Sequence, residues 1–112
     1  MITGAHAMIF TQDEDADRAF LRDVLDIPCI DGGGGWLIYK LPPTELGVHS
    51  GPDNDVHKLY LMCDDLERAI ADLQSKGVRC SEPFRASWGT ATSISLPGGG
   101  TLGLYEPRHE RP

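Results

Sequence analysis

Apolar residues recur along the second half of the chain with the period of a helix. Four of them share one predicted helix face: Leu66, Ala69, Ile70 and Leu73. This stripe predicts a helix that packs against a core, because residues three and four positions apart lie on the same face. Asp64 with Glu67 resembles a capping box at the start of this helix, and Gly77 suits its end.

A second helical pattern lies near the start of the chain. Ala16, Phe20 and Val24 follow a run of acidic side chains that can cap exposed amides, which predicts a helix from Asp15 to Leu25. After each predicted helix, short apolar runs alternate with turn residues and predict strands. These runs are GWLIYKL and TELGVHS in the first half, and CSEPFRAS, GTATSISL and TLGLYEP in the second.

The two halves of the chain repeat one order of elements. AHAMIFTQDEDADRAF and VHKLYLMCDDLERAI each contain a histidine, a short apolar segment, an acidic cluster and a helix-like stretch. His57 lies 51 positions after His6 in this alignment. We therefore expect one α+β domain over residues 1–112, with a first module at about 1–51 and a second at about 52–112.

Composition and charge narrow the class of protein. The 112 residues suffice for one core, and 17 acidic against 10 basic residues give a net charge of -7. Because the basic residues are scattered, we expect neither nucleic acid nor an anionic membrane as a partner. The spacing of Cys29, Cys63 and Cys80 matches neither a redox pair nor a zinc site, so we expect reduced thiols. With no long apolar stretch or signal-peptide pattern, a cytoplasmic location is expected.

The run of four glycines after Asp31 invites comparison with a phosphate-binding loop. It lacks the Gly-Lys-Ser/Thr ending of such loops, and it leads into a predicted strand instead of a helix. We therefore interpret Asp31 to Gly35 as a flexible hairpin connection.

Taken together, the chain resembles the vicinal oxygen chelate superfamily, the group of glyoxalase I, bleomycin-resistance proteins and extradiol dioxygenases. Three segments carry the resemblance: AHAMIF, HKLYLMCDDLERAIADLQSKGV and the closing SLPGGGTLGLYEP. The resemblance implies two βαβββ modules whose curled mixed sheets enclose a cavity, and it implies a homodimer. Fold alone does not assign a reaction.

The resemblance also implies where a metal would be held. In the metal-bearing relatives, one residue on the first strand and one on the last strand of each module point into the cavity. His6 and His57 match the first-strand positions, whereas the last-strand positions fall on Gly47 and Gly103. The two glycines lie 56 positions apart, so we interpret them as equivalent sites where the expected carboxylate ligands are missing.

Strand alternation predicts what stands beside the two glycines. His49 and Tyr105 share a face with them and are expected to lean into the cavity, while Glu106 points the other way. Three imidazoles, from His6, His49 and His57, are chemically suited to a divalent metal. His49, however, is displaced from the family's ligand position by about 6–7 Å along the strand. Histidines hydrogen-bonded in the pocket or partly exposed are the alternative.

The pocket predicted from these patterns is apolar with a few imidazoles. Trp36 and Trp88 lie next to glycines at strand edges and can stack on a flat ligand near the cavity mouth, with plain core packing as the alternative. We predict a protein of the bleomycin-resistance kind that binds a small organic molecule, with no cofactor. The alternative is a metal-dependent lyase, isomerase or dioxygenase in which His6 and His57 bind a divalent metal, with no general base identified. A dimer with a vestigial cavity is a third hypothesis.

Overall fold

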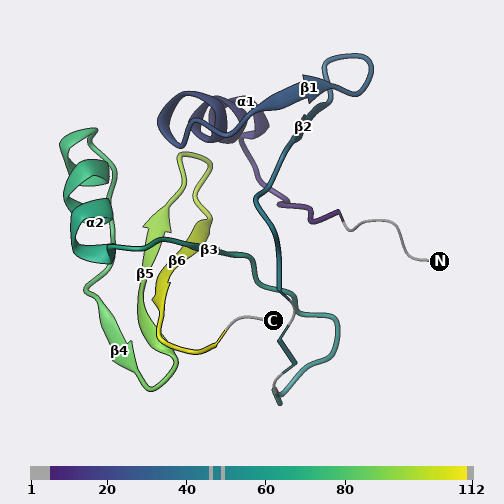
Figure 1. Ribbon diagram of the computed structural model, residues 1–112. Coiled ribbons are helices and arrows are strands. Elements are labelled where there is room, and N and C mark those ends of the chain that lie inside the picture. Colours follow the sequence, from purple (N-terminus) through teal and green to yellow (C-terminus); the bar gives the residue numbers. More distant parts are fainter. Residues whose placement is uncertain (1–5, 46, 49, 111–112) are drawn as a thin grey trace.

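The computed structural model of the chain describes residues 6–45, 47–48 and 50–110. Its elements, in chain order, are α1 (Glu14–Ala19), the π-helix η1 (Phe20–Val24), β1 (Cys29–Asp31), β2 (Leu37–Tyr39), β3 (Tyr60–Met62), α2 (Leu66–Ser75), β4 (Phe84–Ala86), β5 (Gly89–Ser95) and β6 (Thr101–Pro107). The mixture of two sheets and separate helices confirms the predicted α+β class (Figure 1).

The second half of the chain builds a complete βαβββ module. Its sheet has the strand order β3-β6-β5-β4, in which β3 runs parallel to β6 and the remaining pairs are antiparallel. The connection from β3 to its parallel partner β6 runs through α2, β4 and β5, and parallel strands require such a long crossover. The strands predicted over GTATSISL and TLGLYEP therefore exist as β5 and β6, and they form the centre of the sheet.

The first half of the chain contains a separate two-stranded sheet. β1 and β2 pair antiparallel across the glycine run, which confirms the hairpin connection. The carboxylate of Asp31 accepts hydrogen bonds from the amides of Gly33 (2.7 Å) and Gly35 (3.3 Å), so this loop satisfies its own donors. The predicted strands at 6–10 and 44–50 are absent from the described residues, since these segments have no neighbouring strand to receive their backbone hydrogen bonds.

Both helices begin at an aspartate that caps exposed amides. The Asp65 side chain accepts from the amide of Arg68 (3.1 Å), so Asp65 caps α2 and the predicted capping box at Asp64 is one residue out of place. Gly77, with φ of +79°, ends α2 as expected. In the first half, Asp13 caps α1 in the same manner, and the helix continues as a π-turn to Val24, close to the predicted end at Leu25.

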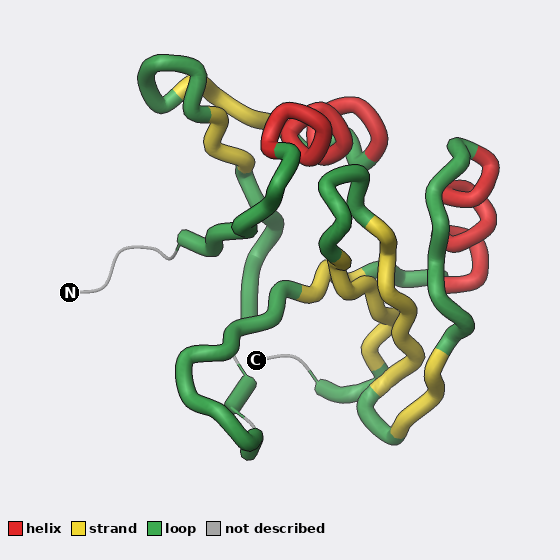
Figure 2. The backbone as a smooth tube through the Cα atoms, turned by 180° about the vertical axis from the view of Figure 1, so that it is seen from behind, coloured by secondary structure: helices red, strands yellow, loops and turns green. Residues whose placement is uncertain are grey.

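The core lies between the helices and one face of the four-stranded sheet. Its buried residues are Phe20, Leu66, Leu73, Ile94, Leu96, Leu102 and Leu104. Paired positions in an antiparallel sheet share a face, so Leu102 with Ile94 and Leu104 with Thr92 point toward the helices. The opposite face, with Gly103 and Tyr105, is not covered by either helix; Figure 2 shows α2 along one side of the strands and α1 across one end.

The first half extends away from this core. The radius of gyration is 14.8 Å, against about 13 Å for a compact domain of this length. Figure 1 shows the β1–β2 hairpin and the chain that follows it lying apart from the four-stranded sheet. No helix in the described part of the chain is long and apolar enough to cross a membrane.

Candidate functional site

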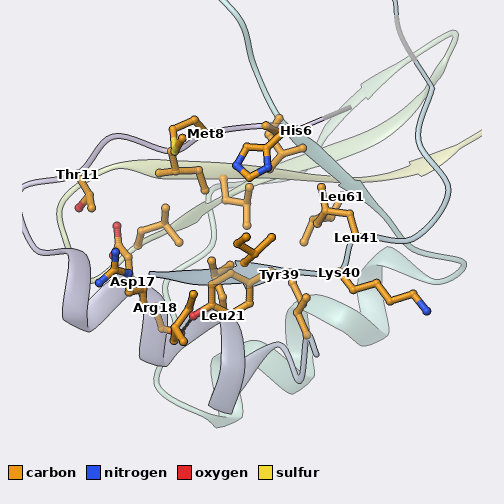
Figure 3. A pocket seen from close by; sticks show the side chains of 18 of the residues that line it. His6, Met8, Thr11, Asp17, Arg18, Leu21, Tyr39, Lys40, Leu41 and Leu61 are labelled. Atoms are coloured by element: carbon orange, nitrogen blue, oxygen red, sulfur yellow. Dashed lines mark hydrogen bonds between the residues drawn. The ribbon is translucent and has the colours of Figure 1, made fainter. Parts of the chain in front are cut away.

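A cavity of about 630 Å³ lies between the first half of the chain and the core. Apolar side chains from the N-terminal segment, α1–η1, β2 and the edge of the large sheet line it, among them Met8, Leu21, Ile38, Leu41, Leu61 and Leu102. Figure 3 shows Met8, Leu21, Leu41 and Leu61 around a common space, together with polar side chains such as those of Thr11, Asp17 and Lys40. A largely apolar space with a few polar groups is the usual form of a small-molecule site.

One end of the cavity is fixed by the buried carboxylate of Asp17. Its Oδ1 accepts a hydrogen bond from the amide of Gly98 (2.8 Å), which ties α1 to the turn between β5 and β6. Among the described residues, Oδ2 is buried without a hydrogen-bond partner. A side chain at position 98 would collide with Thr11 and Asp17, so glycine is required for this close approach.

Tyr39 and Arg18 form a second polar contact in the cavity wall. The Tyr39 hydroxyl donates to the carbonyl of Arg18 (2.7 Å), which joins β2 to α1 (Figure 3). Burial raises the pKa of Tyr39 above its usual value, so the hydroxyl stays protonated at neutral pH and keeps its donor role. Arg18 also pairs with Glu14 at 3.4 Å, which leaves the cavity rim close to electrically balanced.

Two of the predicted site residues meet at this cavity. The rings of His6 and Trp36 lie 5.8 Å apart between centroids, and both line the space. His57 is exposed in the segment before β3 and does not line the cavity, and His49 lies outside the described residues. Neither Gly47 nor Gly103 lines it either.

The structure offers a different alignment of the two halves. The capping residues Asp13 and Asp65 are 52 positions apart, so matching the two helix starts pairs His6 with Lys58 and displaces His57 by one residue. In an extended segment a displacement of one residue moves a side chain to the opposite face. In this alignment the two histidines lie one position apart, and their equivalence stays a prediction.

The other predicted residues, Tyr105 and Trp88, belong to a separate cluster on the open sheet face. We call this cluster the aromatic row; it consists of Tyr60, Phe84, Trp88, Tyr105 and His109. Tyr105 contacts Tyr60 at 6.0 Å and Trp88 at 5.7 Å in edge-to-face geometry, and Phe84 lies 6.5 Å from Trp88. The row contains no residue of the cavity lining.

Gly103 is the position that lets the aromatic row form. It pairs with Tyr60 across β3 and β6, and an added Cβ would collide with the Tyr60 ring. A large neighbouring ring thus covers the glycine, as its lack of a side chain predicts. Gly47 has no heavy atom within 4 Å of the equivalent point, so the two glycines are in different environments.

The predicted orientation of Glu106 is confirmed. Its Oε1 accepts from the amide of Leu66 (2.9 Å) at the start of α2, on the helix side of β6 and away from Tyr105. A carboxylate at this point also interacts favourably with the positive end of the helix dipole. Glu106 therefore has a structural role in joining α2 to the sheet.

A metal of the kind that the resemblance implies has no set of ligands among the described residues. They contain no group of three His, Cys, Asp or Glu side chains that could hold an ion. None of the three cysteines is in a disulfide. Burial raises the pKa of the Cys63 thiol, which disfavours the reactive thiolate. The described residues therefore supply neither a metal-ligand set nor an activated thiolate at Cys63.

Sequence reasoning missed several residues of the two sites. Asp17 is one acidic residue in a run of exposed ones, and no pattern distinguishes it. Tyr60 and Phe84 join the aromatic row only through the strand register, which brings residues far apart in the chain side by side. The face shared by Gly103 and Tyr105 was the available signal for the row, although it does not identify the partner strand.

Solved structures provide the comparison with known proteins. TnmS3, an antibiotic-binding protein from Streptomyces sp. CB03234, matches with 23% identity over 96% of this chain and 99% of its own, with a TM-score of 0.66. A lactoylglutathione lyase from Agrobacterium tumefaciens matches with 16% identity over 93% and 92%, at 0.67. A glyoxalase/bleomycin resistance protein/dioxygenase superfamily member from Sphaerobacter thermophilus DSM 20745 matches with 23% identity over 94% and 98%, also at 0.67.

The chain therefore has the fold of the vicinal oxygen chelate superfamily. No protein-family model matches the sequence, and no curated protein matches it. At these identities the likeness establishes the fold alone, because one fold supports many functions.

Proposed function

We propose that this protein binds a small organic molecule in the cavity between its first half and its core, without catalysing a reaction. The observation that carries the proposal is the cavity itself. Its volume of about 630 Å³ lies within the range of about 300–1,000 Å³ that is usual for such sites. The antibiotic-binding description of TnmS3, which shares the fold, supports the same kind of ligand.

The chemistry of the lining indicates what the ligand is. Leucine and isoleucine are the commonest residues of the lining, and the Trp36 ring beside His6 offers a surface for a flat group. The ionic groups at the rim carry both signs, from Glu14 and Asp17 against Arg18 and Lys40. We therefore expect a mainly apolar molecule of moderate size with few charges.

The metal-dependent alternative lacks a specific observation in its favour. His6 is the one predicted ligand on the cavity wall, and the described residues offer no second and third donor beside it. His49 lies outside the described residues, so its role as a third metal ligand stays a sequence prediction.

A paired substitution tests the binding proposal. Leu41 lines the cavity but is not part of the packed core, so Leu41→Trp should fill the space at little cost to folding. Val48 is exposed and outside the lining, so Val48→Trp adds the same ring without filling anything. We expect Nile red, a neutral apolar dye, to bind the unmodified chain and Val48→Trp equally and to bind Leu41→Trp at least tenfold more weakly. Equal binding by all three forms would contradict the proposal.

We further propose that the chain forms a homodimer in the cytoplasm. The proposal is supported by large apolar side chains left exposed in the first half, including Met8, Phe10 and Val48. Segment 6–10 belongs to no strand of the described sheets, which leaves its backbone available to pair with a second copy. Sedimentation velocity tests the dimer: a dimeric species that Phe10→Asp converts to monomer is the expected result, and a monomer at all accessible concentrations is the contrary one.

A further inference from the structure

The carboxylate of Asp17, at one end of the cavity, has one hydrogen-bonded oxygen and one oxygen without a partner. Asp17 is 5% exposed, and its Oδ1 accepts the hydrogen bond of the Gly98 amide at 2.8 Å. Oδ2 is buried as well, and no donor among the described residues reaches it. Because burying a carboxylate oxygen without a donor costs free energy, native proteins seldom leave one unpaired. A bound molecule that brings a donor would supply the missing partner.

The charge of this carboxylate is not balanced by a basic side chain of the described residues. Arg18 follows Asp17 in the chain, but its guanidinium pairs with Glu14 at 3.4 Å. No Lys, Arg or His side chain in the described ranges lies within ion-pair distance of Asp17. Figure 3 shows Lys40, the other basic group of the lining with a permanent charge, on the far side of the space and directed away from Asp17. A positive group therefore interacts most favourably at the Asp17 end of the cavity.

The approach to Oδ2 passes Thr11, which lines the same end of the cavity (Figure 3). A side chain at Gly98 would meet the Thr11 hydroxyl and Oδ2 together, so the two groups lie beside one another. Thr11 belongs to no strand and is only partly buried. Its hydroxyl accepts a solvent-exposed hydrogen bond from the Asp13 amide (3.2 Å), which water can replace. The Thr11 side chain can therefore rotate away from Oδ2 without breaking the pairing of a sheet.

We propose that Asp17 is the specificity-determining residue of the cavity and selects apolar molecules that carry an ammonium group. The apolar part of the molecule lies against the leucine and isoleucine side chains of the lining, and its N–H group donates to Oδ2 once Thr11 has rotated. Oδ1 keeps the hydrogen bond of the Gly98 amide. The inference rests on the binding function proposed for the cavity, and it adds the chemical class of the ligand: an amine that is protonated at neutral pH.

Two probes of nearly the same shape test this selection at neutral pH. Naphthylmethylamine carries an ammonium group, and ethylnaphthalene has a methyl group in its place. Displacement of Nile red measures the affinity of each probe for the unmodified chain, for Asp17→Asn and for Asp15→Asn. Asp17→Asn keeps an acceptor for the Gly98 amide and replaces Oδ2 by a group that cannot accept. Asp15→Asn removes the same charge at an exposed position of α1 outside the cavity lining.

We expect Asp17→Asn to weaken the binding of naphthylmethylamine by about 10- to 100-fold, the effect of one hydrogen bond to a charged group. Ethylnaphthalene should bind all three forms equally, and Asp15→Asn should bind both probes as the unmodified chain does. The Gly98 amide signal in ¹H–¹⁵N spectra reports the place directly, because this amide donates to the same carboxylate. Naphthylmethylamine should shift that signal, and ethylnaphthalene should not. Slow exchange of the Gly98 amide in Asp17→Asn verifies that the variant is folded.

The outcomes distinguish this inference from the proposed function. If neither Nile red nor either probe binds, the cavity is not a binding site and both proposals fail. If Nile red binds but naphthylmethylamine does not displace it, the cavity function stands and selection by Asp17 is overturned. The same conclusion follows if Asp17→Asn binds naphthylmethylamine as tightly as the unmodified chain does. An equal loss of affinity in Asp15→Asn would assign the effect to the overall charge of the protein and would also overturn the role of Asp17.

Discussion

The two halves of the molecule bury their apolar residues to very different extents. In the four-stranded half, Leu102 and Ile94 are almost completely buried under the helices. In the first half, Phe20 reaches the core, whereas Met8 and Phe10 remain exposed around a cavity. The difference arises from strand pairing. β3, β5 and β6 satisfy one another's backbone hydrogen bonds, whereas segment 6–10 has no strand beside it. The half with the complete sheet buries its apolar residues, and the other half leaves apolar surface exposed.

The largest expected effect tests this division directly. Leu102→Ala should lower the free energy of unfolding by about 2–5 kcal/mol, since it empties a fully packed position. At concentrations where the chain is monomeric, Phe10→Ala should change it by no more than about 0.5 kcal/mol, because the ring is 91% exposed. Urea denaturation measures both. A Phe10→Ala cost that grows with protein concentration is expected if the proposed dimer buries this ring, whereas a large cost in the monomer would contradict the division between the two halves.

The two glycines that the sequence pairs should respond in opposite directions. Gly103→Ala forces a methyl group into the Tyr60 ring and should destabilise by about 1–3 kcal/mol. Gly47→Ala meets open space and should be neutral or stabilising by up to about 1 kcal/mol, because it restricts the unfolded chain. Thermal unfolding distinguishes them. Adding Tyr60→Ala to Gly103→Ala should recover part of the lost stability, because it removes the ring that the new methyl group meets. Equal destabilisation by Gly103→Ala and Gly47→Ala would indicate that the two glycines are in equivalent environments.

How far the sequence predicts the fold depends on how local each pattern is. The apolar stripe and Gly77 define α2 from its own residues, and the alternation in GTATSISL defines β5 without reference to a partner. AHAMIF has an equally strand-like pattern, but a strand also needs a neighbour for its amides and carbonyls. That neighbour is not encoded in the segment, so pattern alone overestimates the strands of the first half.

The same limit applies to the candidate sites. His6 and Trp36 were predicted one by one and meet at the cavity, and Trp88 and Tyr105 meet on the open face. The sequence placed all four in one pocket because it gave their strands no three-dimensional order. The structure separates them into two clusters of side chains, and the cluster on the open face depends on strand register, which is set by pairing between distant segments.

A smaller effect is expected at the joint between the two halves. Asp17→Ala removes the acceptor of the Gly98 amide and should destabilise by about 1–2 kcal/mol. Asp17→Asn keeps an acceptor oxygen at the position of Oδ1, so this variant should lose less stability than Asp17→Ala. Hydrogen exchange of the Gly98 amide checks the cause: exchange should accelerate in Asp17→Ala and stay slow in Asp17→Asn. Unchanged exchange in the alanine variant would mean that another contact holds the halves together.

The smallest expected effect concerns the contact within the first half between Tyr39 and Arg18. Burial raises the pKa of Tyr39 above its ordinary value of 10.0, so folding favours the protonated hydroxyl. The resulting contribution to stability is fully present below pH 10.0 and decreases as the pH rises through the folded-state pKa. Tyr39→Phe removes the hydrogen bond and should lower the free energy of unfolding by about 0.5 kcal/mol at neutral pH. This value is the lower end of the usual range for a hydrogen bond, because the bond is only partly buried. Stability curves from pH 7 to 11 should therefore converge for the two proteins on the alkaline side. Parallel curves would show that Tyr39 titrates as it does in the unfolded chain, and therefore that its hydroxyl is not buried in the folded protein.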